Sequence, residues 1–159
     1  MHSGDQKVRS LSLPTPAESL LPHSFPMVYI DRLLEAGDDR GLCEVHLTSD
    51  HMLLNARGRM DRAGFIELAA QGFATLKGWG FVCQGLPFAI GYLVGVQGFE
   101  FQGDACVGDV LLVETVELGV FESFSVVRVM ITREGVALAQ GKIKLYVPDA
   151  GDQEHKVVE

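Results

Sequence analysis

The residue with the clearest chemical potential is Glu67, because it carries the only formal charge in the fourteen-residue apolar segment Ala63–Leu76. A carboxylic acid held in apolar surroundings keeps its proton, which suits it to act as a general acid. Gln71 follows one helical turn later on the same face, where its amide can orient Glu67 or a substrate carbonyl. Structural alternatives stay open: Glu67 can pair with an arginine or form a hydrogen bond within a dimer, and Gln71 can satisfy another buried polar group.

A base for the same chemistry has to come from another residue, and histidine is the side chain that most readily exchanges protons near neutral pH. His51 lies in the polar loop before the apolar segment and is the candidate, although a loop histidine can equally be a solvated surface residue. We expect His23 to fix the turn before the first strand and His46 to lie on the polar face of a strand. No residues have metal-ligand spacing, so neither a metal nor a cofactor is expected.

Positive charge is concentrated just before the apolar segment, at Arg57, Arg59 and Arg62. The chain as a whole has 13 basic and 21 acidic residues and a formal charge of −8. A local basic rim in an acidic protein can steer an acidic partner into place, but it can also be an ordinary solvated loop. The overall negative charge argues against nucleic acid or an anionic membrane as a partner.

These residues have to be positioned by a folded unit, and 159 residues with 47% hydrophobic and 21% charged side chains are typical of one globular domain. We expect residues 21–148 to form that domain, residues 1–20 to be a flexible arm, and residues 149–159 to be a flexible tail. The apolar segment predicts a helix with Asp61 as its N-cap and Gly78 as its C-terminal stop. A helix that is apolar on nearly every face must be surrounded by protein.

Alternating and β-branched runs on both sides of this helix predict strands. Two precede the helix and about four follow it, at residues 27–34, 43–48, 92–101, 110–118, 125–131 and 137–147. This order predicts the α+β class, with one long central helix wrapped by a curved antiparallel sheet of about six strands. Such a sheet leaves one face and its edges open, so we expect a homodimer.

The cysteines and the N-terminal sequence bear on the compartment. Cys43, Cys83 and Cys106 are widely spaced without a C-x-x-C motif, which is typical of reduced, mostly buried thiols. The first residues lack an apolar stretch of signal-peptide length, and Ala63–Leu76 is too short to span a bilayer. We therefore expect a soluble, cytoplasmic protein without a membrane partner.

Four short stretches follow one another at consistent spacing. They are LPHSFPM at 21–27 with Ile30-Asp31-Arg32, IELAAQ at 66–71, Gly95-Val96-Gln97 with Phe101, and Gly108-Asp109. Together they resemble the 3-hydroxyacyl-carrier-protein dehydratases of fatty acid synthesis over roughly residues 21–147. The loop Asn55–Met60 is more similar to a divergent branch of these enzymes found beside aryl-polyene synthesis genes. The resemblance implies the hotdog fold, a helix wrapped in an antiparallel sheet that is usually dimeric.

The resemblance also implies an activity, the elimination of water from a 3-hydroxyacyl thioester to give a trans-2-enoyl thioester in fatty acid or polyene-type synthesis. The acyl group would be carried on the phosphopantetheine arm of an acyl carrier protein, which Arg57, Arg59 and Arg62 would dock. In the family, a histidine of one subunit faces the helix carboxylate of the other. On this pattern Glu67 protonates the leaving hydroxyl, and His51, two positions earlier than the family's histidine, takes the α-proton.

Substrate-binding residues are expected along the helix and on the strand after it. Amides at the helix start, those of Ala63 and Gly64, would hold the thioester carbonyl. The apolar side chains of Phe65 and Phe73 would line a tunnel for the acyl chain. Gly95 permits close approach of the backbone to the acyl chain or to a partner strand, although a glycine in a strand can equally mark a bulge.

Two other functions are compatible with the same fold, because one fold hosts several chemistries. One is thioester hydrolysis, with Glu67 activating water. The other is a non-catalytic subunit that pairs with a related, active dehydratase.

Overall fold

The computed structural model describes residues 11–148, which form one long α-helix and a seven-stranded antiparallel sheet. The order of the strands across the sheet is β1-β2-β3-β5-β6-β7-β4. Along the chain, the elements are β1 (Thr15–Pro16), the 3-10 turn η1 (Ala17–Ser19), β2 (Arg32–Ala36), β3 (Arg40–His46), α1 (Arg62–Gln84), β4 (Tyr92–Phe101), β5 (Val110–Phe121), β6 (Phe124–Arg133) and β7 (Val136–Tyr146).

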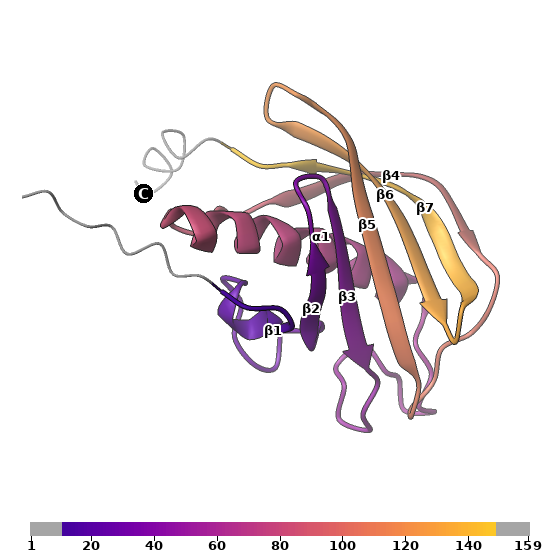
Figure 1. The fold of residues 1–159 in the computed structure, drawn as a ribbon. Helices are drawn as coiled ribbons and strands as arrows, with labels where there is room; N and C mark the ends of the chain where they lie inside the picture. Colours follow the sequence, from indigo (N-terminus) through magenta and orange to yellow (C-terminus); the bar gives the residue numbers. More distant parts are fainter. Residues whose placement is uncertain (1–10, 149–159) are drawn as a thin grey trace, which may run out of the picture.

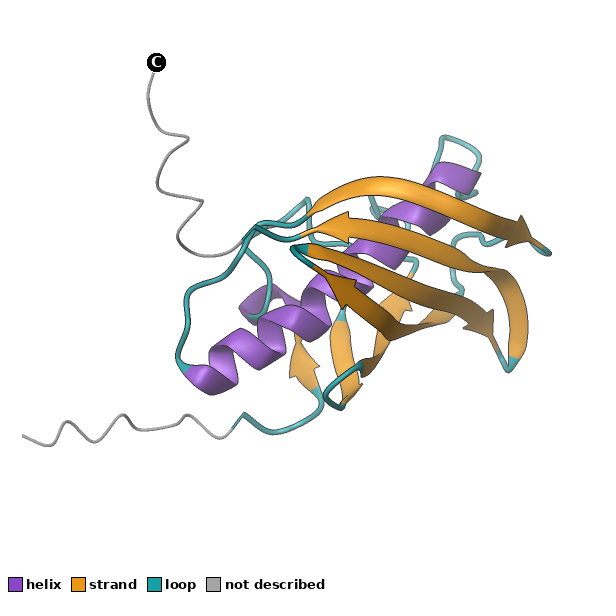
Figure 2. Ribbon diagram, turned by 90° about the horizontal axis from the view of Figure 1, so that it is seen from above, coloured by secondary structure: helices purple, strands orange, loops and turns teal. Residues whose placement is uncertain are grey.

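The sheet curves around α1, which lies on its concave side (Figure 1). Seen from above, the strands arch across the helix and leave its opposite side uncovered (Figure 2). In β3, β5, β6 and the second half of β7, alternate residues point inward and are buried, in keeping with the period of two predicted for β3 and β7. The large side chains buried in the core include Phe65, Leu68 and Phe73 from α1 and Leu33, Val45, Leu111, Val113, Val127, Ile131 and Ile143 from the strands.

The predicted α+β hotdog architecture is confirmed, with seven strands rather than about six. The additional strand is β1, in which Thr15 and Pro16 pair with Leu33 and Arg32 of β2. The expected flexible arm at residues 1–20 needs correction, because Ala17 and Leu20 are fully buried in the core. Their apolar side chains find room against α1, so the folded unit begins earlier than expected. Residues 1–10 of that arm and the expected tail at 149–159 lie outside the described residues.

The helix is longer than predicted. It begins after Asp61, which occupies the N-cap position as expected but makes no side-chain capping hydrogen bond. It does not stop at Gly78 and continues to Gln84, where Gly85 adopts a left-handed conformation with a φ of 69°. Gly78 instead allows a close approach, since a Cβ atom there would lie 1.8 Å from the carbonyl oxygen of Leu20. The absence of a side chain therefore serves packing at this position and not termination.

One face of α1 stays open within this chain, although the helix is apolar on nearly every side. The residues of this open face recur at helical spacing. Ala63 and Glu67 are exposed, and Ala70, Ala74 and Lys77 are half-buried. At the end of the sheet, β4 pairs with β7 on one side only and exposes the apolar side chains of Tyr92, Val94 and Val96. The expectation that protein surrounds the helix is therefore not met by one chain alone.

The three cysteines differ in exposure. Cys43 on β3 is fully buried, and burial raises the pKa of its thiol to about 12. Its Sγ lies 3.8 Å from the carbonyl oxygen of Gly72 on α1, so it acts as a packing group between sheet and helix. Cys83 is half-buried and Cys106 is exposed, so only one of the three thiols matches the expectation of burial closely.

A turn before β5 is organised by Asp109. Its carboxylate accepts hydrogen bonds from the Cys106 N–H at 2.9 Å and from the Arg133 guanidinium at 2.7 Å. Arg133 also donates to the carbonyl oxygen of Asp104, at 3.0 Å, which ties β6 to the turn. Burial alone would raise the pKa of Asp109, but the hydrogen bonds from Cys106 and Arg133 outweigh it and hold this pKa below its usual range.

Replacing Asp109 by Asn is expected to lower the free energy of unfolding at pH 7 by about 1 kcal/mol, because Arg133 is partly solvated. Since the folded state lowers the pKa, the stabilisation is present above the ordinary aspartate pKa of about 3.9 and disappears as the pH falls through the folded-state value. Urea unfolding of both proteins at pH 7 and pH 3 measures this. Asp104→Asn is the matched control, because its carboxylate is exposed. A deficit equally large at both pH values would contradict the assignment.

Candidate active site

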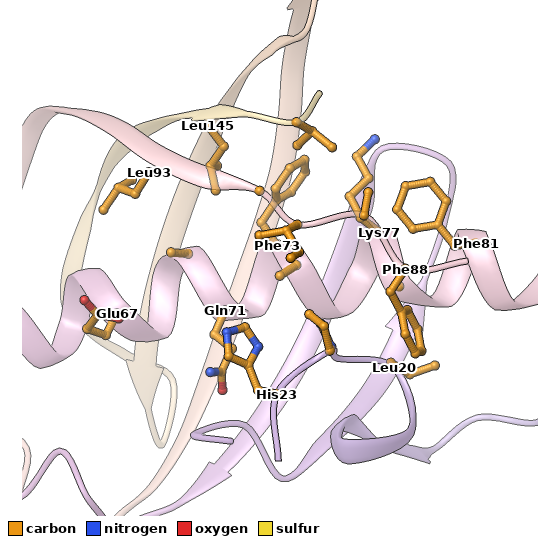
Figure 3. Close-up of a pocket in the computed structure, with 18 residues that line it drawn as sticks. Leu20, His23, Glu67, Gln71, Phe73, Lys77, Phe81, Phe88, Leu93 and Leu145 are labelled. Atoms are coloured by element: carbon orange, nitrogen blue, oxygen red, sulfur yellow. The ribbon is translucent and has the colours of Figure 1, made fainter. Parts of the chain in front are cut away.

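The open face of α1 forms the floor of a cavity of about 210 Å³. Its walls come from residues 20–23, from the segment 88–93 that leads into β4, and from the end of β7. Figure 3 shows Glu67, Gln71 and His23 toward one end of this cavity and Phe81 and Phe88 toward the other. The site therefore combines a polar end that carries titratable groups with an aromatic, apolar end.

Glu67 lines the polar end of this cavity and is exposed in the single chain. Its neighbours along the open helix face, Ala70 and Ala74, are small and leave space beside it. Within residues 11–148 the carboxylate forms no ion pair and no hydrogen bond, so no arginine of the same chain pairs with it. A hydrogen bond within a dimer stays a prediction. Within this part of the chain, Glu67 is an unpaired acid that a bound ligand can reach.

Gln71 holds a distant segment of chain against the helix. Its Oε1 accepts hydrogen bonds from the backbone N–H groups of Tyr29 and Ile30, the latter at 3.1 Å, and its Nε2 donates to the carbonyl oxygen of Met27 at 2.9 Å. All three bonds are made to backbone groups more than 40 positions away in the sequence. The amide therefore satisfies buried polar groups, which is the structural alternative given for this residue, and its hydrogen bonds do not go to Glu67.

The segment before Met27 is held at a second point. Leu20 is fully buried and its carbonyl oxygen lies against Gly78 of α1. Gly78 and Gln71 thus fix residues 20–30 against α1 beside its open face, with His23 between the two anchors. The imidazole of His23 is exposed, lines the Glu67 cavity, and makes no side-chain hydrogen bond to another described residue. The expectation that His23 only fixes a turn therefore leaves out its position in the cavity.

At the apolar end, Phe73 lines the cavity as the sequence predicted, together with Phe81, Phe88 and Leu93. Lys77 also reaches this wall, where its Nζ lies 3.0 Å from a carboxylate oxygen of Glu117 and 5.3 Å from the Phe73 ring centre. Because Glu117 already neutralises Lys77, the cavity carries no unpaired positive charge at this end. From Glu67 to Phe81 the helix rises by about 21 Å, a length suited to an extended chain.

His51 lies away from this cavity within one chain. Its Nδ1 accepts a hydrogen bond from the Leu53 N–H at 3.2 Å, so its Nε2 carries the proton and donates to the carbonyl oxygen of Tyr29 at 3.1 Å. Both ring nitrogens are therefore occupied, and the side chain braces the loop before α1 against the chain near Tyr29. The structure does not bring His51 and Glu67 together in one protomer.

The other predicted binding residues are also placed outside the cavity. The Gly64 N–H donates to the carbonyl oxygen of Asp61 at 2.9 Å, and Ala63 lies at the exposed start of the helix. Phe65 is buried against Phe101, with ring centres 5.9 Å apart. Gly95 pairs with Lys144 directly after an irregularity in the β4–β7 register, which is the bulge given as its alternative.

Arg57 and Arg59 on the loop before α1, and Arg62 at the first position of α1, are exposed. Asn55 fixes this loop by accepting hydrogen bonds from the backbone N–H groups of Arg57 at 2.9 Å and Arg59 at 3.1 Å. The Arg62 guanidinium lies 5.1 Å from the centre of the Phe101 ring. Among the described residues none of the three forms an ion pair, so their charge is available to a partner.

Of the cavity lining, sequence reasoning missed residues 20–23 with His23, the segment 88–93 and the end of β7. The contact between residues 20–30 and α1 spans 44 positions in the bond from Gln71 to Met27. A contact between residues so far apart in the sequence leaves no trace in the local pattern of apolar residues.

Within residues 11–148, no helix has the length and apolar character needed to cross a bilayer.

Several solved structures are similar to this chain in fold. The dehydratase heterocomplex ApeI:P from Xenorhabdus doucetiae is similar, with 24% identity and a TM-score of 0.81 over 91% of this chain and 99% of that chain. A hypothetical thioesterase from Streptococcus pneumoniae, solved with coenzyme A, has 14% identity and a TM-score of 0.57 over 73% and 84% of the two chains. The PaaI protein of the E. coli phenylacetic acid degradation operon has 16% identity and a TM-score of 0.56 over 72% and 80%. These likenesses show the shared fold.

Among curated proteins, no sequence match is found. The model of the ApeP-like family, described as ApeP dehydratase, matches residues 15–157, which include every element of the fold and the whole cavity. The divergent dehydratase resemblance noted in the sequence is thereby confirmed. The chain belongs to the ApeP-like dehydratase family.

Proposed function

We propose that this chain acts in the dehydration of 3-hydroxyacyl thioesters to trans-2-enoyl thioesters, in fatty acid or polyene-type synthesis. The observation that carries the proposal is the position of Glu67, an unpaired carboxylate at the polar end of a cavity whose other end is apolar. A 3-hydroxyacyl thioester also has a polar end, which holds the thioester and the reacting carbons, and an apolar end, which is the rest of the acyl chain. Membership of a dehydratase family supports the reaction class.

The elimination needs two proton transfers. A base takes the α-proton, the electrons of that C–H bond form the C2–C3 double bond, and the C3–O bond breaks. Glu67 gives its proton to the departing hydroxyl, which leaves as water.

The same proposal includes a second hotdog subunit, either another copy of this chain or a related chain. The unpaired edge of β4 and its exposed Tyr92, Val94 and Val96 support pairing at this edge. The similarity to a protein solved as a heterocomplex supports a related chain as the partner. We also propose that an acyl carrier protein delivers the substrate and docks at Arg57, Arg59 and Arg62, whose charges are unpaired among the described residues.

Hydration of crotonyl-pantetheine thioester, followed as loss of its conjugated absorbance, tests the reaction in the reverse direction. In this direction the Glu67 carboxylate has to take a proton from the attacking water. Glu67→Gln removes that base while keeping the size of the side chain, so we expect kcat/KM to fall roughly 100-fold or more. Glu35→Gln is the control, because Glu35 is an exposed carboxylate of β2 that does not line the cavity. Equal loss in both variants, or none in Glu67→Gln, would contradict the role of Glu67.

A second candidate is thioester hydrolysis, because the chain shares its fold with a hypothetical thioesterase. Release of free pantetheine thiol, detected with a thiol reagent in the same reaction, separates hydrolysis from hydration. If the chain is inactive alone, the assay is repeated after mixing with a related dehydratase subunit. Activity that appears only in the mixture would show that this chain completes a partner's site.

A further inference from the structure

We propose that His23 is the base that removes the α-proton, acting from the same protomer as Glu67. The inference rests on the proposed dehydration, and it departs from the expectation that His51 supplies this base. Its starting point is that one cavity is lined by both a carboxylate, Glu67, and an imidazole, His23 (Figure 3). An elimination of water needs one acid and one base on either side of the reacting carbons, and this pair supplies both.

The three histidines of residues 11–148 differ in what their rings already bind. Both ring nitrogens of His51 are occupied by Leu53 and Tyr29, as described above. His46 lies outside the cavity and its Nε2 is 2.9 Å from a carboxylate oxygen of Glu44. His23 makes no side-chain hydrogen bond to another described residue. Within this part of the chain, it is therefore the histidine whose nitrogen is free to accept a proton from a ligand.

The position of His23 is fixed by its surroundings even though its ring is exposed. On one side, the carbonyl oxygen of the buried Leu20 packs on Gly78 of α1. On the other, Gln71 binds the backbone at Met27, Tyr29 and Ile30. A catalytic group has to be held in place by the structure around it, and these two anchors on the helix that carries Glu67 meet that requirement. The two cavity residues thus share one rigid support.

The proposed step balances without any added reactant. A nitrogen of His23 takes the proton from C2, the C2–H electrons form the double bond, and the hydroxyl on C3 leaves with the proton of Glu67. The products are the enoyl thioester, water, a protonated His23 and an ionised Glu67. Transfer of the proton from His23 to Glu67 through solvent restores the starting state. In hydration the same transfers run in reverse.

The first test measures hydration of crotonyl-pantetheine thioester by wild type, His23→Gln and His46→Gln. We expect His23→Gln to lower kcat/KM roughly 100-fold or more, with His46→Gln unchanged. Thermal unfolding is recorded for each variant, and an unchanged Tm in His23→Gln shows that the loss is not one of folding. Full activity in His23→Gln would overturn the inference and leave the proposed dehydration intact.

A second test does not depend on turnover. A 2-alkynoyl pantetheine thioester accepts a nucleophile at its β-carbon, so a free imidazole nitrogen beside the bound acyl group forms a covalent adduct. Peptide mapping by mass spectrometry is expected to place the adduct on His23, with protection by a saturated butyryl thioester and no adduct in His23→Gln. An adduct on His51 alone, or no protected adduct, would overturn the inference. Labelling of His23 in a protein that hydrates nothing would support its placement while rejecting the dehydratase proposal.

Discussion

Gly78→Ala is expected to lower the free energy of unfolding by about 3 kcal/mol, which corresponds to a fall in Tm of roughly 6–12 °C. The added Cβ atom would lie 1.8 Å from the carbonyl oxygen and 2.8 Å from the carbonyl carbon of Leu20. Both are backbone atoms of a fully buried residue, so no side-chain rotation can relieve the overlap. Residues 17–20 would have to move away from α1, and the wall of the cavity would move with them.

Gly80→Ala is the matched control for this experiment, because Gly80 lies in the same helix and a Cβ atom there meets nothing within 4 Å. Alanine is the better helix former, so this substitution is expected to raise stability by about 0.5–1 kcal/mol. Thermal and urea unfolding should therefore show a loss of stability for Gly78→Ala and a gain for Gly80→Ala. Changes of the same sign and size would show that Leu20 does not pack on the helix as described.

Gln71→Met is expected to lower the free energy of unfolding by about 3–4 kcal/mol, because each backbone donor left unsatisfied on burial costs about 1–3 kcal/mol. Methionine has a similar length but cannot accept from Tyr29 and Ile30 or donate to Met27. The loss also releases one of the two anchors of the segment that carries His23. Hydration activity, measured at a temperature where the variant is folded, is therefore expected to fall as well.

The comparison variant for this prediction is Gln84→Met, at the exposed C-terminal end of the same helix. An exposed side chain away from any contact changes stability by no more than about 0.5 kcal/mol on substitution. Urea unfolding gives the free energy for both proteins. If Gln71→Met is as stable as Gln84→Met, water or a relaxed backbone already satisfies the Met27–Ile30 groups, and the anchor described for Gln71 is wrong.

Much of the fold was predictable because its signals are local. The strand predicted at residues 92–101 coincides with β4, and the Arg133-Glu134-Gly135 turn joins β6 to β7 as its residue types indicate. The end of the helix was predicted wrongly, since Gly78 carries the same local signal as a helix stop. Its actual reason, contact with Leu20, comes from a residue 58 positions earlier in the chain.

The candidate site likewise contains one residue that the sequence identifies and others whose roles depend on contacts between distant parts of the chain. Glu67 was identified because a lone charge on an apolar helix is visible in the sequence itself. That Gln71 binds the backbone of residues 27–30, and that His23 thereby comes to line the Glu67 cavity, depends on contacts made only in the folded chain. Whether an exposed loop residue such as His51 has free ring nitrogens also depends on its neighbours, here Leu53 and Tyr29.

The residues that form the cavity wall determine at which stage of folding the cavity can form. The wall joins Leu20, near the start of the folded unit, to Leu145 and Val147, at its end. During synthesis the helix with Glu67 leaves the ribosome long before the last strand does, so the cavity cannot close until nearly the whole domain is available. Contacts between residues so distant in sequence slow folding, because the connecting chain must first be ordered. Ligand-binding competence should therefore appear late in folding, together with the final cooperative step and not before it.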